Sequence, residues 1–241
     1  MTPRYLILLF LMAFQSLSAQ NEGGVHSFDA NLDAWLLGGG AVTFSTGYAL
    51  QKKVPILTEA EIMKLDPLRI NPLDRLACDN YDLKAKKTSD ILLKSSAVLP
   101  FALLLDNNSR KDLGILSVML TETILINNGI TGIFKGSIRR KRPYVYNANA
   151  PLLIKQERNA SYSFFSGHAS NSAAYAVFAA KVFADNNPNS DWRPFVWGAA
   201  FSIPAATSFF RFKAGKHFPT DVVVGYAVGA TLGWLIPELH L

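Results

Sequence analysis

The sequence has almost none of the residues that build disulfide and cysteine–metal sites. Cys78 is the single cysteine in 241 residues, which excludes an internal disulfide framework and any multi-cysteine zinc or iron–sulfur site. The four histidines, at positions 26, 168, 217 and 240, show no HExxH-type spacing. We therefore predict an activity that needs no metal and no cofactor.

Charged residues are also scarce, and no linker divides the chain. With 17% charged and 49% hydrophobic residues, the protein is too apolar to be a disordered tail and should bury a core. It contains no internal repeat, low-complexity tract or Gly/Ser-rich linker. The simplest division is a signal peptide over residues 1–19, an amino-terminal arm with one apolar segment over 20–88, and a helical core over 89–241.

The amino terminus has the pattern of a secretory signal peptide. A short basic start at residues 1–4 is followed by an uncharged apolar run at 5–14 and a small-residue exit, SLSAQ. Cleavage after Ser18 or Ala19 fits this pattern, and an uncleaved signal anchor is the alternative. Either one directs the protein to the cell envelope.

Six apolar segments follow, and their length and lack of two-residue alternation predict helices. Ser89–Asp90 and Asp112 stand where helix N-caps are expected, and Thr58 with Glu61 has the spacing of a capping box. The fold class is thus all-α, a six-helix bundle. The segments cover residues 34–51, 91–105, 113–134, 169–184, 194–210 and 222–237.

Two environments are open for this bundle. A spanning helix needs about 20 apolar residues, whereas these segments are shorter or are interrupted by Lys94, Glu122 and Lys181. Charged groups are costly in lipid. We favour a multi-pass membrane protein, and a soluble helical bundle of the same connectivity is the alternative.

Positive charge is in excess and locally concentrated. The net charge is +6, and five of the eight residues 135–142 are basic. Such an excess favours nucleic acid, anionic lipid headgroups or phosphorylated substrates as partners. Because no nucleic-acid-binding motif or aromatic stacking platform accompanies it, we expect no nucleic acid partner.

Three short clusters carry the candidate chemistry. Residues 135–143 follow the third apolar segment, residues 166–168 open the fourth, and residues 211–221 join the fifth to the sixth. If consecutive helices are antiparallel, all three clusters meet at one end of the bundle. Helices that begin after Ser166 and Pro219 would point free N–H groups at this end, which favours an anion.

The residue types predict a cage for a tetrahedral phosphate. Cationic donors come from Lys135, Arg142 and Arg211, two of them with the planar fork that matches phosphate oxygens. Ser166 and the backbone N–H groups around Gly167 add neutral donors. Such a cage should bind more tightly as charge develops in the transition state.

Two histidines beside this cage suggest in-line displacement at phosphorus. His217 is the predicted nucleophile, because Asp221 lies four residues later and can fix its imidazole tautomer. His168 has no acidic neighbour in the sequence and is the predicted general acid. The other basic residues, at 139–141, are expected to face solvent or headgroups rather than substrate.

The three clusters resemble the signature of the type 2 phosphatidic acid phosphatase (PAP2) superfamily, which includes class A acid phosphatases and vanadium haloperoxidases. That signature, K-x6-R-P, P-S-G-H and S-R-x5-H-x3-D, keeps its spacing here over residues 135–143, 165–168 and 210–221. The resemblance implies a PAP2-type helical core, a phosphohistidine on His217 and no metal. Phe165 and Phe210 replace the proline and serine of the pattern.

The resemblance implies a metal-independent phosphatase acting on a phosphomonoester or pyrophosphate, with a lipid as the favoured carrier. A soluble periplasmic acid phosphatase for small phosphoesters, a vanadium haloperoxidase and a non-catalytic binder of anionic lipid are the alternatives. If residues 34–51 cross the membrane, the site faces the cytoplasm. If they do not cross, it faces the periplasm, which the resemblance favours. The oligomeric state is not predicted.

Overall fold

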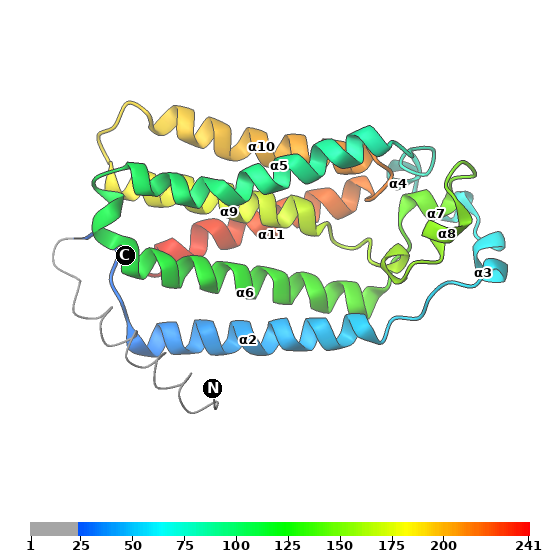
Figure 1. Ribbon diagram of the computed structural model, residues 1–241, viewed down its shortest axis with the longest axis horizontal. Coiled ribbons are helices and arrows are strands. Elements are labelled where there is room, and N and C mark those ends of the chain that lie inside the picture. Colours follow the sequence, from blue (N-terminus) through cyan, green and yellow to red (C-terminus); the bar gives the residue numbers. More distant parts are fainter. Residues whose placement is uncertain (1–23) are drawn as a thin grey trace.

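The computed structural model describes residues 24–241, which fold into six long helices and several short ones. The predicted signal peptide lies outside the described residues. The long helices lie side by side along the long axis of the molecule (Figure 1). The all-α class is confirmed, since each predicted apolar segment forms one of these helices. They are α2 (Ala30–Lys52), α5 (Leu83–Ala102), α6 (Leu113–Ile138), α9 (Gly167–Asn186), α10 (Arg193–Lys213) and α11 (Pro219–Glu238).

Short helices gather at one end of the bundle (Figure 1). At this end α6 and α10 finish and α9 and α11 begin, so consecutive long helices from α5 onward are antiparallel. Apart from two 3₁₀ turns between α5 and α6, at Leu103–Leu105 and Ser109–Asp112, the short elements lie at this end. They are α3 (Glu59–Met63), α4 (Pro72–Arg75), α7 (Pro143–Tyr146) and α8 (Leu152–Lys155), with 3₁₀ turns at Pro67–Arg69 and Arg158–Ser161. We call this end the catalytic end, and the opposite one the distal end.

Three helix starts test the predicted capping. Asp112 occupies the N-cap position of α6, as predicted, but its side chain makes no capping hydrogen bond. The capping box at α3 is confirmed, because Thr58 Oγ1 accepts from the Glu61 backbone and the Glu61 carboxylate accepts from the Thr58 backbone. The N-cap predicted at Ser89–Asp90 is wrong. Helix α5 begins at Leu83, where the Asp82 carboxylate accepts from two backbone N–H groups. The first turns of α5 are polar, so the apolar run did not mark where the helix begins. Asp90 lies inside α5 rather than at its cap.

Close packing of α11 on α9 fixes the relative position of their first turns. Glycines on α11 face the α9 backbone, and a Cβ at Gly225 would lie 2.5 Å from the Ser166 carbonyl oxygen. At Gly229 the corresponding distance to the Ser170 oxygen would be 1.9 Å. No larger residue fits without moving a helix. Glycine thus brings the starts of two helices together at the catalytic end.

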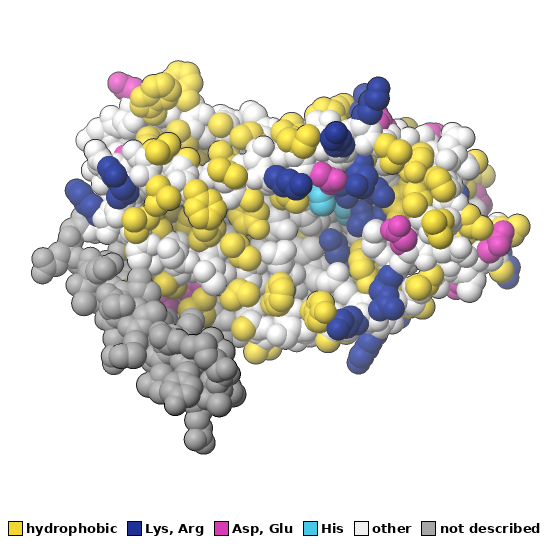
Figure 2. Space-filling view, viewed as in Figure 1, with side chains coloured by type: hydrophobic (Ala, Val, Ile, Leu, Met, Phe, Trp, Pro, Cys, Tyr) yellow, Lys and Arg dark blue, Asp and Glu magenta, His cyan; other side chains and the backbone are white. Residues whose placement is uncertain are grey.

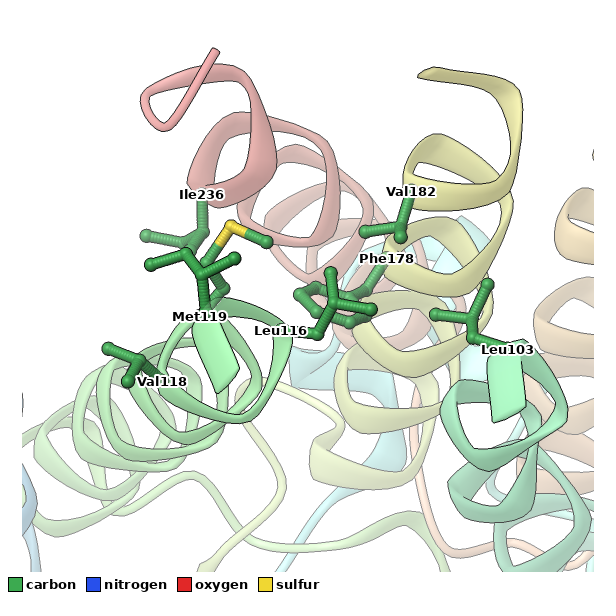
Figure 3. Close-up of a cluster of buried hydrophobic side chains, with 8 residues drawn as sticks. Leu103, Leu116, Val118, Met119, Phe178, Val182 and Ile236 are labelled. Carbon is green, nitrogen blue, oxygen red and sulfur yellow. The ribbon is translucent and has the colours of Figure 1, made fainter. Parts of the chain in front are cut away.

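An apolar cluster fills the distal end. Figure 3 shows Met119 of α6 beside Ile236 of α11, with Phe178 of α9 next to them. These side chains are 2% exposed or less. Full burial of such a side chain contributes roughly 1.5–3 kcal/mol, so this cluster is a main source of stability and holds the ends of α6, α9 and α11 in register.

Within residues 24–241, three helical segments are long and apolar enough to cross a membrane: Leu83–Leu105, Ser109–Tyr146 and Pro219–Glu238. Of the charged residues that interrupt the apolar segments, Glu122 and Lys181 point into the bundle. Lys94 is exposed. Charged side chains that face the interior do not contact lipid. The cost of burying Glu122 and Lys181 in lipid is therefore not an argument against a membrane-embedded bundle.

Candidate active site

The three motif clusters meet at the catalytic end, as antiparallel helices require. Lys135 is near the end of α6, Ser166 and His168 are at the start of α9, and His217 joins α10 to α11. Figure 2 shows histidine side chains in a hollow surrounded by lysine and arginine side chains. The predicted site residues are therefore assembled in one place, whereas their catalytic roles stay predictions.

His217 presents one ring nitrogen to the cationic pocket. Its Nδ1 lies 2.7 Å from the Ser163 carbonyl oxygen, to which it donates, so that a neutral ring has its lone pair on Nε2. This Nε2 lies 3.2 Å from Nη1 of Arg142. Burial, followed by the charges of Arg142, Arg211 and Lys135, holds the pKa of His217 well below its usual value. The Nε2 nitrogen is thus unprotonated, as the predicted role of nucleophile requires.

Asp221 contacts His217 less directly than the sequence predicts. Its Oδ2 is 3.7 Å from His217 Nδ1, farther than the Ser163 carbonyl. The carboxylate accepts instead from the Phe218 backbone at 2.9 Å and from the Ser163 hydroxyl. Asp221 therefore fixes the two segments that hold the imidazole. A backbone carbonyl has no side-chain signature, which is why sequence reasoning missed Ser163.

Arg140 belongs to the site's framework, and the expectation that it faces solvent or headgroups is wrong. Its guanidinium donates to Asp221 Oδ1 at 2.6 Å and to Asp74 Oδ2 at 2.7 Å, and it lies 4.1 Å from the centre of the Phe218 ring. Asp74 also accepts from the Thr220 backbone at 3.0 Å. The amino-terminal arm thus braces the first turn of α11 through an acid 66 residues before Arg140.

His168 has an acidic partner that its sequence neighbourhood does not show. Its Nε2 lies 2.9 Å from Asp90 Oδ1 on α5. Asp90 also accepts from Arg211 Nη1 at 3.3 Å and, on its other oxygen, from Lys86. The pairing went unrecognised because 78 residues separate the two side chains and because Asp90 was assigned to a helix cap.

The predicted cationic donors are largely buried around the pocket. Arg142 and Arg211 are 7% and 4% exposed. Arg142 is fixed by donation to the Asn159 and Lys216 carbonyls at 2.8 and 3.0 Å. Nε of Arg211 is buried without a hydrogen-bond acceptor. A buried, unsatisfied cationic donor is costly, so this arrangement favours a bound anion.

Gly167 makes room for the third cation. A Cβ at this position would lie 2.9 Å from Nζ of Lys135, so glycine leaves room for the ammonium group at the start of α9. Beside it, the Ser166 hydroxyl accepts from the Ala169 backbone and its hydrogen is left for a ligand. Phe165, the first departure from the motif, is buried and packs 5.5 Å from the Phe134 ring.

The sequence model described as the PAP2 superfamily matches residues 116–241, the region that carries all three motif clusters. The chain belongs to the PAP2 superfamily. The resemblance of the motifs is thereby confirmed, and no solved structure matches this chain. Asp74 and Asp90, the two acids that sequence reasoning missed, precede the region that the PAP2 superfamily shares.

Two curated relatives are similar to this PAP2 member. A lipid A 4'-phosphatase of Porphyromonas gingivalis is 26% identical over 163 residues, which are 67% of this chain and 64% of that protein. A lipid A 4'-phosphatase of Bacteroides thetaiotaomicron is 28% identical over 102 residues, 42% of this chain and 41% of that protein. The chain thus matches less than two thirds of the length of either relative.

Proposed function

We propose that this PAP2 member is a metal-independent phosphatase that hydrolyses a phosphomonoester on a membrane lipid. One observation carries the proposal. The unprotonated Nε2 of His217 faces Arg142 inside a pocket where Nε of the buried Arg211 has no hydrogen-bond acceptor. This combination matches a phosphate dianion, since the cations neutralise its oxygens while the imidazole reaches phosphorus.

In the first step, Nε2 of His217 attacks phosphorus and the bond from phosphorus to the lipid oxygen breaks. The Ser163 carbonyl accepts the hydrogen bond from Nδ1–H, which keeps its proton, and so stabilises the positive ring that forms. Lys135, Arg142 and Arg211 hold the equatorial oxygens as charge develops. The departing lipid oxygen takes a proton from the doubly protonated ring of His168, whose Nε2–H stays on Asp90. Burial and the charges of Arg211 and Arg142 lower the pKa of His168 to about 3, and the negative charge of a bound phosphate opposes these charges and favours the protonated ring.

In the second step, water attacks the phosphohistidine, the bond from nitrogen to phosphorus breaks, and inorganic phosphate leaves. His168 now accepts a proton from the water, by microscopic reversibility. Asp90, 2.9 Å from Nε2 of His168, orients the ring for both transfers. No step passes through a metal ion.

A lipid carrier is supported by the outer surface of the bundle. Besides three helices apolar enough to span a membrane, large apolar side chains on the long helices are exposed, including Trp35 (81%), Val98 (62%), Phe195 (70%) and Val223 (66%). Large exposed apolar areas favour a membrane. This supports the membrane-embedded phosphatase over the soluble alternative.

The substrate head group is proposed to be a phosphorylated sugar. Lys135 lines a cavity of about 160 Å³ together with Tyr48, Gln51 and Asn128. An aromatic face beside amide side chains offers stacking and hydrogen bonds to a sugar ring. The two relatives named as lipid A 4'-phosphatases support the same substrate class.

The catalytic end is proposed to face the periplasm, as predicted from the resemblance. Ala148 is exposed at this end, so Ala148→Cys should react with a membrane-impermeant maleimide in intact spheroplasts. Labelling that requires permeabilisation of the inner membrane would place the site on the cytoplasmic side.

Phosphate release from a lipid-linked sugar phosphate in detergent, in the presence of chelator, tests the function. The His217→Ala protein should lose activity by about a thousandfold or more, while Lys141→Ala, a change in a basic residue outside the pocket, should retain it. Full turnover by His217→Ala would refute the mechanism. Extraction of the protein by osmotic shock without detergent would refute the membrane assignment.

A further inference from the structure

A second cluster of buried titratable side chains lies away from the catalytic end. It consists of Asp33 on α2, Glu122 on α6 and His240, which follows α11. All three side chains are 0% exposed. Thirteen residues separate Glu122 from Lys135, which corresponds to about 20 Å along a helix. The proposed phosphatase reaction uses none of these groups.

The ligand-type atoms of this cluster converge. The Nε2 atom of His240 lies 3.1 Å from Asp33 Oδ1 and 3.6 Å from Glu122 Oε2. All three atoms lie within 4.8 Å of one another. A tetrahedral zinc ion with bonds of about 2.05 Å separates its ligand atoms by about 3.3 Å. The two shorter separations therefore bracket the value expected around one ion.

The orientation of the histidine ring favours a ligand rather than a simple hydrogen bond. Nδ1 of His240 lies 2.7 Å from the Ile236 carbonyl, to which it donates. In the neutral ring, Nε2 then presents a lone pair to two carboxylates, which also present lone pairs. Three acceptors that face one point repel one another unless a proton or a metal cation lies between them. Metal-binding histidines are typically held by such an N–H bond to a carbonyl.

Glu122 supplies an independent sign of a missing partner. Both of its carboxylate oxygens are buried and have no hydrogen-bond donor. Among residues 24–241, no lysine or arginine forms an ion pair with Glu122 or Asp33. By contrast, Asp185, also towards the distal end, is paired with Lys181 at 2.7 Å. Two buried carboxylates without a basic partner are costly, and one divalent cation would neutralise both.

We propose that Asp33, Glu122 and His240 bind a divalent transition-metal ion, of which zinc is the best fit. An imidazole with two carboxylates suits zinc, manganese or ferrous iron better than the all-oxygen environment that magnesium prefers. The ion is structural, because the catalytic pocket lies too far away to share it. The prediction of no metal drawn from histidine spacing applies to the reaction, and it considered local spacing only.

The proposed ion joins parts of the chain that are far apart in sequence. Figure 1 shows the end of the chain beside the first turns of α2 and α6. The carbonyl of His240 also accepts from the Ser27 backbone at 2.8 Å, and Ile236 is part of the apolar cluster. A metal ion at this point would fasten α2, which precedes the PAP2 region, to α6 and the end of α11.

Metal analysis of the full-length protein, purified in detergent without affinity metal, tests this site. We expect about one equivalent of zinc, manganese or iron per chain. After removal of the metal by a chelator, Tm should fall, and added Zn²⁺ should restore it. Glu122→Gln should lower the bound metal by about tenfold or more. Asp185→Asn, a matched change in a paired carboxylate, should leave it unchanged.

Two results would overturn the proposal. One is protein that is metal-free as purified and whose Tm does not respond to Zn²⁺, Mn²⁺ or Fe²⁺; a proton shared by the two carboxylates would then explain the cluster. The other is Glu122→Gln protein that retains as much metal as the unmodified chain, which would show binding elsewhere. If Glu122→Gln does not fold, removal and return of metal with the unmodified protein decides the question.

Discussion

The two ends of the bundle bury opposite kinds of unpartnered group. In the pocket at the catalytic end, Nε of Arg211 is a buried donor without an acceptor. Towards the distal end, both oxygens of Glu122 and Oδ1 of Asp112 are buried acceptors without a donor. The sign of the unpartnered atoms therefore indicates the ligand: an anion at the catalytic end and a cation at the distal cluster.

The carboxylates of the two ends also differ in their basic partners. Asp74, Asp90 and Asp221 at the catalytic end each accept from an arginine. Their charges are therefore used to hold cations and histidines in place, and the net charge of the pocket remains positive. Among residues 24–241, Asp33 and Glu122 pair with His240 and with no lysine or arginine, and Asp33 also accepts from the Asp29 backbone at 2.9 Å. The same residue type thus positions catalytic groups at one end and offers metal ligands at the other.

The largest effect is expected from removing the charge that organises the catalytic end. Asp90→Asn preserves the shape of the side chain but weakens its pairing with His168 and Arg211. We expect kcat to fall by about a hundredfold to a thousandfold, with a smaller change in KM, because Asp90 positions the proton donor. Steady-state kinetics on a lipid phosphate measures this split.

The matched control for this prediction is Lys86→Ala. Lys86 pairs with the other oxygen of Asp90, and its side chain is 45% exposed, so its loss should change kcat by no more than about twofold. If Asp90→Asn retained full kcat, acidic pairing would not organise the catalytic end, and the contrast between the two ends would fail there.

The excess of cations at the catalytic end should also be visible in the pH profile. Burial and the neighbouring Arg142, Arg211 and Lys135 lower the pKa of His217 below its ordinary value of 6.5. His217 attacks only when unprotonated, so kcat/KM, which reports the free enzyme, should decline only as the pH falls through this lowered pKa. Lys135→Met removes one cation, raises the pKa of His217 and should move the decline to higher pH.

Measuring kcat/KM from acid to neutral pH for both proteins checks this shift, with Lys141→Ala as the control. A decline at the same pH in the Lys135→Met protein would mean that burial and the arginines alone set the pKa. A shift to lower pH would contradict the charge argument altogether.

Sequence reasoning succeeded where the signal is local. The six helices follow from apolar runs, and the three motifs contain Lys135, Arg142, His168, Arg211 and His217, which the antiparallel arrangement brings to one end. Their spacing also indicated the PAP2 superfamily, because short motifs in a fixed order survive as a local pattern.

What could not be predicted depends on contacts between distant segments. The Asp90–His168 pair, the Arg140 bridge to Asp74 and the Asp33–Glu122–His240 cluster each join residues at least 66 positions apart. The Ser163 carbonyl is a backbone group that any residue could supply. In addition, polar first turns concealed the start of α5, and with it the place of Asp90.

The smallest effects are expected from glycine-to-alanine changes at two places where α11 packs against α9. A Cβ at Gly225 would lie 2.5 Å from the Ser166 oxygen at the catalytic end, and one at Gly233 would lie 2.4 Å from the Ala174 oxygen farther along α9. Each alanine substitution should therefore cost about 1–3 kcal/mol of stability, seen as a lower Tm. Gly38→Ala, with no atom within 4 Å of the new Cβ, should not lower it.

The two variants should differ in turnover, although the added Cβ atoms approach the α9 carbonyl oxygens equally closely. Gly225→Ala displaces the turn that carries Ser166 and His168, so turnover per folded molecule should fall by about tenfold. Gly233→Ala displaces α9 two turns farther from the pocket and should leave turnover nearly unchanged. Equal losses of turnover in both would mean that α9 moves as one rigid body, and that the catalytic end is not positioned independently of the rest of the bundle.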